Sequence, residues 1–151
     1  MENNKSYLKL ISMTIIHFIF MFVIMYSAVY IFDHAYFNLN KIYMALIMTI
    51  PMISIEIFMM SKMYPNKIYN YTIVGVSLIL FITFFLFIRS QTAIEDKQFL
   101  RSMIPHHSSA ILMCDEANIT DPEIKTLCDS ITAAQIREIK QMEQILSRLN
   151  K

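Results

Sequence analysis

Two adjacent histidines, His106 and His107, have the strongest potential for binding chemistry in this sequence. Neighbouring residues on a helix point about 100° apart, so we expect one histidine to face a second helix and the other to face solvent or a partner. The side chains that could join them carry thioether, carboxylate or amide groups: Met103, Met113, Gln135, Glu138 and Met142. Imidazole and thioether ligands suit a soft ion such as Cu(I). The same residues also fit a metal-free polar layer, in which His106 and Glu138 form a buried pair.

A second group of possible ligands lies in long hydrophobic runs. Two ladders recur at four-residue steps: Met13, His17, Met21 and Met25 in the first run, and Met44, Met48, Met52, Glu56 and Met60 in the second. Such steps keep side chains on one slowly drifting helix face. The methionines either fill packing gaps or form a track of soft ligands. His17, Met21, Met52 and Glu56 are secondary metal candidates on the second interpretation. A carboxyl inside a membrane span is costly, so we expect Glu56 to be neutral, paired with His17, or bound to an ion.

Two cysteines, Cys114 and Cys128, flank a predicted turn and lie at comparable height in an antiparallel helical hairpin. Outside the cytoplasm this position permits a disulfide that joins the two helices. The alternatives are two buried free thiols or two additional soft metal ligands.

The elements that position these residues are helices, because 56% of the residues are hydrophobic and only one is glycine. Three runs, at 10–32, 42–61 and 68–88, are each long enough to cross a bilayer, which takes ~20 residues. We therefore predict an all-α protein with a membrane domain at 1–90 and a hairpin domain at 91–151. The membrane partner is the lipid bilayer, and the net charge of +1 gives no indication of nucleic-acid binding.

The basic residues around the three runs predict an orientation. Lys5 and Lys9 precede the first run, and Lys62 and Lys67 separate the second from the third. Because basic loops favour the cytoplasmic side, we expect a cytoplasmic N-terminus and an extracytoplasmic C-terminal domain. The predicted location is the inner (cytoplasmic) membrane of a bacterium, with several crossings.

The C-terminal domain reads as two helices joined by a short turn. The first covers about 92–117, and Pro105 predicts a kink or a fresh start within it. The second helix runs to about Leu149 and begins either with a Thr120–Glu123 capping box or with Asp121 as the cap before Pro122. One hairpin cannot close a four-helix bundle alone. We therefore expect a homo-oligomer or packing against a membrane partner.

Two segments of this hairpin resemble a known family. The runs Phe99–Cys114 and Ile131–Met142, with the pattern M-x-x-H-H-x-x-A-I-x-M in the first, are similar to the family called domain of unknown function 305. The resemblance implies a ferritin-like helical module of the copper-binding type. It makes Met103, His106, His107, Met113 and Met142 the metal candidates, and Gln135 and Glu138 match a second motif. The three preceding spans and the two cysteines depart from the commonest pattern of that family.

The sequence therefore predicts a membrane-anchored protein that binds copper in metal homeostasis or resistance. The alternative is a metal-free helical module that assembles with a membrane partner. An enzyme is not expected, because the Glu-x-x-His pairs of di-iron oxidases do not occur in the chain.

Overall fold

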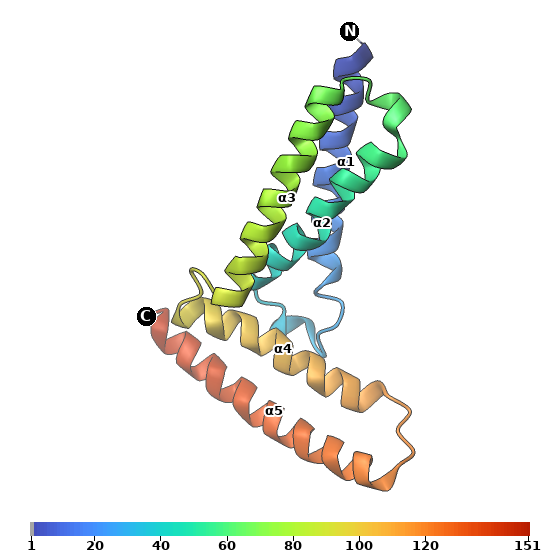
Figure 1. The fold of residues 1–151 in the computed structure, drawn as a ribbon. Helices are drawn as coiled ribbons and strands as arrows, with labels where there is room; N and C mark the ends of the chain where they lie inside the picture. The colour runs from blue at the N-terminus through green and yellow to red at the C-terminus, as the bar shows by residue number, and fades with distance from the viewer. Residues whose placement is uncertain (1) are drawn as a thin grey trace. The chain divides into compact units, whose positions relative to one another are not determined.

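The computed structural model describes residues 2–151, with side chains from residue 5 onward, and these residues form helices and no strand. The elements are α1 (Glu2–Ile24), η1 (Phe32–His34), α2 (Leu39–Met59), η2 (Ser61–Met63), α3 (Lys67–Ser90), α4 (Asp96–Glu116) and α5 (Pro122–Leu149) (Figure 1). Two compact units contain them. The first unit comprises Met1–Ile24 and Asn40–Thr92, and the second comprises Met25–Leu39 and Ala93–Lys151.

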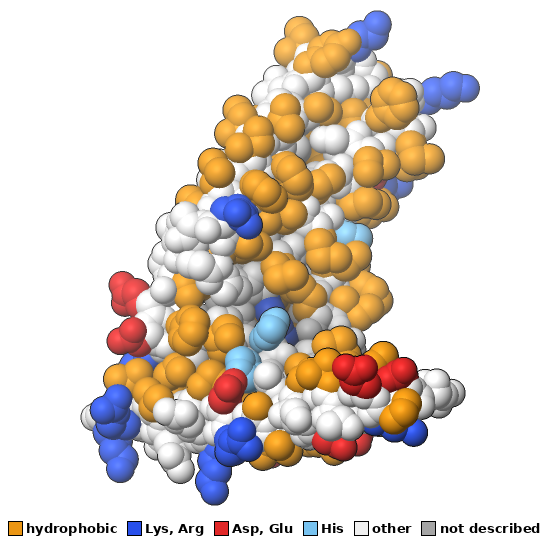
Figure 2. Space-filling model, turned by 60° about the horizontal axis from the view of Figure 1, so that its bottom comes forward, with side chains coloured by type: hydrophobic (Ala, Val, Ile, Leu, Met, Phe, Trp, Pro, Cys, Tyr) orange, Lys and Arg blue, Asp and Glu red, His pale blue; other side chains and the backbone are white. Residues whose placement is uncertain are grey.

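The first unit contains three helices that are long and apolar enough to span a membrane: Lys5–Ile24, Leu39–Met59 and Lys67–Ser90. Most of their large apolar side chains are exposed, including those of Ile16 and Ile79. Figure 2 shows this apolar surface, which covers the helices of the first unit. A small buried cluster of Leu10, Ile57 and Tyr64 joins α1 to α2 and to the loop that follows it.

The first hydrophobic run ends earlier as a helix than the sequence predicts. A span at 10–32 was expected, but α1 ends at Ile24, and the connecting segment 25–39 belongs to the second unit. In this segment Val29 is buried, whereas Ile31 and Phe32 are exposed, and the Tyr30 N–H donates to Ser108 Oγ at 2.9 Å. Hydrophobicity measures how apolar a run is and does not show where its helix ends, which is why the predicted span was too long.

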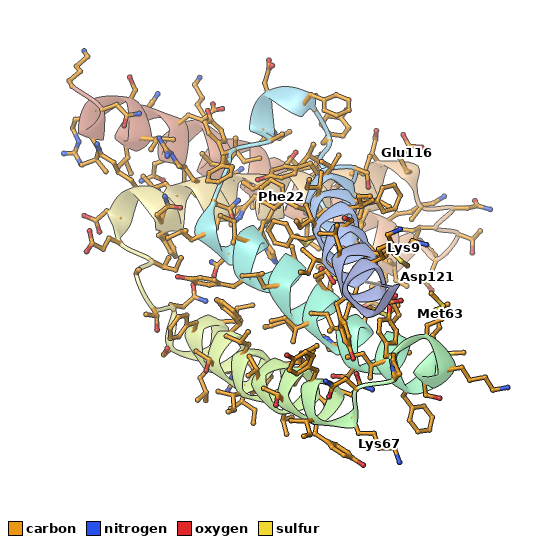
Figure 3. The ribbon with its side chains drawn as sticks, turned by 90° about the horizontal axis from the view of Figure 1, so that it is seen from above. Lys9, Phe22, Met63, Lys67, Glu116 and Asp121 are labelled. Carbon is orange, nitrogen blue, oxygen red and sulfur yellow. A yellow bond between two sulfur atoms is a disulfide. The ribbon has the colours of Figure 1, made fainter. Side chains whose placement is uncertain are left out.

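The second unit is built on α4 and α5, which lie side by side and antiparallel (Figure 1). Its core is a cluster of five buried side chains: Leu100, Ile104, Ile111, Ile139 and Leu146. Asp121 caps α5, because its Oδ1 accepts from the N–H groups of Glu123 and Ile124, and Pro122 takes the first helical position. This confirms the second of the two predicted helix starts. Figure 3 labels Asp121 and also Glu116, where α4 ends.

The two cysteines form a disulfide between α4 and α5. Cys114 and Cys128 are bonded, with their Cα atoms 5.3 Å apart. This is the first of the three alternatives that the sequence left open. The bond joins the helices close to their connecting turn.

Pro105 lies inside α4 without ending it. Proline has no N–H, so the carbonyl of Arg101, four residues earlier, loses its helical hydrogen bond. Asn38 of the connecting segment replaces the missing donor, since its Nδ2 donates to the Arg101 carbonyl at 3.3 Å and to the Tyr36 carbonyl at 2.9 Å. A side chain from a distant segment thus supports a continuous helix where the sequence predicted a kink or a new start.

Candidate metal centre

The imidazole of His107 is held between the two helices of the hairpin. The side chain is buried, with Nδ1 3.0 Å from the Met103 carbonyl oxygen one turn earlier in α4. On the other side of the ring, Nε2 lies 2.7 Å from Glu138 Oε2 in α5. Both ring nitrogens therefore have defined partners, and the ring plane is fixed.

These partners determine where the protons lie. A carbonyl oxygen only accepts, so Nδ1 of His107 carries its hydrogen and donates to Met103. Nε2 then faces the Glu138 carboxyl across the 2.7 Å contact. The Glu138 side chain is 53% exposed, so this pair contributes at most about 1 kcal/mol to stability. Histidines that bind metals commonly use this arrangement, in which one nitrogen donates to a carbonyl and the other faces the ion.

His106 has a different environment from His107. It is exposed, and the centroids of the two imidazole rings are 6.0 Å apart. The expectation that one histidine faces α5 and the other faces outward is thus confirmed. The metal-free interpretation paired Glu138 with His106, and this was wrong because the residue that faces α5 is His107.

Two methionines lie one turn away from the His107–Glu138 pair. In antiparallel helices, the residue four before His107 lies level with the residue four after Glu138. These residues are Met103 and Met142, both half-buried, and Met142 packs against the hairpin core. The hairpin therefore brings imidazole, carboxylate and two thioethers to adjacent turns of α4 and α5.

The other hairpin candidates lie at its margin or outside it. Gln135 is half-buried, one turn before Glu138 in α5. Met113 is 65% exposed and stands six residues beyond His107, about 9 Å along the helix axis. Cys114 and Cys128 are bonded to each other, so neither sulfur is a thiolate that could hold an ion.

In the first unit, the two polar candidates Glu56 and His17 have different environments. Glu56 Oε1 accepts a hydrogen bond of 2.8 Å from the Tyr64 hydroxyl, so the carboxyl is not paired with His17. His17 Nε2 is buried and has no hydrogen-bond partner within the described part of the chain. Met21 is half-buried and Met52 is half-exposed.

The Tyr64 hydroxyl, which donates to Glu56, has a raised pKa. Burial, and then the hydrogen bond to the Glu56 carboxylate, raise the pKa of Tyr64 from its usual value of 10.0 to about 12. Both causes favour the protonated hydroxyl, which keeps donating to Glu56. This tyrosine lies in the loop after α2 and was not singled out from the sequence.

A second polar group that the sequence did not reveal comes from the connecting segment 25–39. His34 Nδ1 lies 2.9 Å from Ser108 Oγ, next to His107 in α4, and His34 Nε2 lies 3.9 Å from Glu143 Oε1. Ser108 is fully buried. No periodicity links a loop residue such as His34 to a helix 74 positions later, so only the folded chain shows the contact.

The described residues 2–151 contain no group of three His, Cys, Asp or Glu side chains that could hold a metal ion. An ion held in the hairpin would therefore need thioether ligands besides His107 and Glu138. Thioethers favour soft ions over hard ones. The donor set fits Cu(I) and does not fit an ion that requires several oxygen ligands, such as Mg²⁺ or Ca²⁺.

Comparisons with known proteins agree with this division of the chain. The profile of the family described as Domain of unknown function (DUF305) matches residues 89–151. Uncharacterized protein L153 of Acanthamoeba polyphaga mimivirus is 39% identical over 111 residues, which cover 72% of this chain and 71% of the viral protein. That match is longer than the family domain, so it includes part of the three-helix unit. No solved structure matches the chain. The chain is a member of the DUF305 family, with its family domain following three helices that are long and apolar enough to span a membrane.

Proposed function

We propose that this protein is a membrane-anchored copper-binding protein that serves copper homeostasis or resistance. The ion binds in the hairpin to His107 Nε2 and to the thioethers of Met103 and Met142, with Glu138 as a carboxylate partner. One observation carries the proposal. The His107 ring is fixed by the Met103 carbonyl so that Nε2 faces the Glu138 carboxyl of α5, with Met103 and Met142 one turn away along their helices.

The chemistry of capture follows from the hydrogen bonds. A cation that binds Nε2 replaces the hydrogen bond between His107 and Glu138. The Glu138 side chain is 53% exposed, so its carboxylate can move aside or remain near the positive charge. A monovalent soft ion suits this set because the imidazole and the thioethers are neutral.

The membrane part of the proposal rests on exposed surface and on the number of crossings. A water-exposed surface as apolar as that of α1 and α3 would drive aggregation, whereas lipid solvates it. The connecting segment 25–39 and residues 93–151 form one unit although α2 and α3 lie between them. Two crossings return the chain to the side that it left, so contact between these segments agrees with three spans.

Charge and the disulfide support the proposed orientation. Lys5, Lys9, Lys62 and Lys67 gather at the end of the first unit that holds the start of α1 and the start of α3; Figure 3 labels two of them. That end would be cytoplasmic. The hairpin then lies outside the cytoplasm, where the Cys114–Cys128 disulfide is stable.

The test is Cu(I) binding by the full-length protein in detergent, measured against a chromophoric Cu(I) chelator. His107→Ala should weaken binding at the hairpin by at least about tenfold, because it removes the fixed imidazole. Met103→Leu combined with Met142→Leu should also weaken binding, since it removes both thioethers and keeps the apolar volume. His106→Ala is the matched control and should have a smaller effect than His107→Ala. Equal affinity in wild type and His107→Ala would contradict the proposal.

A second function is favoured by a different observation. Met113, Ile124 and Leu127 are exposed apolar side chains near the disulfide end of the hairpin. In a metal-free interaction module, they would contact a membrane partner or a second copy of the chain. This function predicts that charged substitutions at Ile124 and Leu127 abolish assembly, while His107→Ala leaves assembly intact. Chemical crosslinking in native membranes would distinguish the two outcomes.

A further inference from the structure

We propose that the three-helix unit contains a second soft-cation site, between α1 and α2, built on His17 with thioether ligands from Met21, Met48 and Met52. This site is separate from the hairpin centre, and its existence does not depend on metal binding there. It would take the same chemical class of ion, a monovalent soft cation such as Cu(I) or Ag(I).

The first observation is the unsatisfied imidazole of His17. Its Nε2 is buried and has no hydrogen-bond partner among the described residues. A buried polar atom without a partner costs about 1–3 kcal/mol. An ionisable side chain within an apolar span normally faces the bundle interior and marks a site for an ion or a proton. His17 fits this pattern, since it is half-buried in a helix with no charged residue from Leu10 to Ile24.

The second observation is the level of His17 along α1 relative to the residues of α2. Leu10 and Ile57 share one buried cluster, and α1 and α2 run in opposite directions (Figure 1). His17 lies seven residues after Leu10, so it is level with Ile50, seven residues before Ile57. Thr49, next to Ile50, is buried, and its hydroxyl also has no hydrogen-bond partner in the described part of the chain. Two unsatisfied polar atoms thus lie at one level of the two helices.

The third observation is the set of thioethers around this level. Met21 is one turn beyond His17 on the half-buried face of α1. Met48 and Met52 precede and follow the level of Ile50 in α2, and both are half-exposed. Methionine side chains are long and flexible, so these sulfurs can reach a cation beside His17 from adjacent turns.

The chemistry of the environment selects the ion. The nearest carboxyl of α2, that of Glu56, is hydrogen-bonded to Tyr64 and is six residues, about 9 Å, from the level of Ile50. The site therefore offers neutral nitrogen and sulfur ligands. Transfer of a divalent ion from water to such surroundings is costly, whereas a soft monovalent ion gains the most from thioethers.

The test uses the full-length protein with the hairpin site removed by His107→Ala. Titration with Cu(I) against a chromophoric chelator should still find a bound equivalent in this background. His17→Leu and the pair Met21→Leu with Met52→Leu should each weaken that binding by at least about tenfold. Met59→Leu is the matched control, because Met59 is exposed at the end of α2, and it should bind as the background does.

A second variant separates ligation from folding. His17→Met replaces imidazole with a thioether, which is also a soft ligand, so binding should persist. His17→Leu must keep the helix content of the background by circular dichroism. The proposal is overturned if His17→Leu binds as tightly as the background, or if the His107→Ala background binds no Cu(I). If Cu(I) binding depends on His17 and is unchanged by His107→Ala, the hairpin proposal fails and this one stands.

Discussion

Removal of the Cys114–Cys128 disulfide should lower the stability of the hairpin by an amount that follows from the loop it closes. The two cysteines are 14 positions apart. A closed loop of about 15 residues restricts the unfolded chain by about 3 kcal/mol in the chain-entropy account. We therefore expect Cys114→Ala combined with Cys128→Ala to lower the free energy of unfolding by about 3 kcal/mol.

Urea unfolding of the detergent-solubilised protein, followed by circular dichroism, would measure this loss. Spans within a micelle resist urea, so the transition should report on the hairpin. With a slope of about 1 kcal/mol per M, the midpoint should fall by roughly 3 M. Reduced wild type should unfold at the same urea concentration as the double variant. A loss below about 1 kcal/mol would refute the reasoning, because the loop would then contribute little disorder to the unfolded state.

Three further predictions concern individual contacts. Asp121→Ala should cost about 1 kcal/mol in the same urea assay, because it removes the acceptor for two N–H groups, whereas Thr120→Ala should have almost no effect. Ile104→Ala should cost about 2–5 kcal/mol, because this fully buried side chain belongs to the hairpin core. Tyr64 should remain protonated in an ultraviolet titration while exposed tyrosines ionise, and Glu56→Gln should lower its pKa from about 12. Because the folded-state pKa is raised, the stabilisation by this hydroxyl is complete below pH 10.0, the unfolded value, and is lost as the pH approaches about 12.

Periodicity was sufficient to predict the helices and one part of the candidate centre. The heptad-like pattern of α5 placed Glu138 and Met142 on one stripe, and the angle between adjacent residues predicted that only one histidine would face α5. It could not select His107 over His106, because the choice depends on how α4 is rotated against its neighbours. The buried side chains of the hairpin core determine that rotation. The sequence does not show which residues these are, because the stripe on each helix mixes polar and apolar residues.

Contacts made by residues in loops could not be predicted from the periodicity of the helices. The bond from Tyr64 to Glu56 depends on how the chain turns after α2, and the contact of His34 with Ser108 depends on where a loop without periodicity lies. The apolar residues at 25–32 had the composition of a membrane span and were predicted as one. Composition measures how apolar a run is and does not show where its helix ends, which here is at Ile24.

The connecting segment 25–39 also has a consequence for the order of events during synthesis. The ribosome makes this segment before α2 and α3, yet its partners, Ser108 and Arg101 among them, are made after both of these helices. The second unit therefore cannot be completed until α2, α3 and the helices that follow them have been synthesised. Until then, the hydrogen bond from Asn38 to the Arg101 carbonyl cannot form. A nascent chain arrested after α3 should therefore expose segment 25–39 to chaperones or proteases.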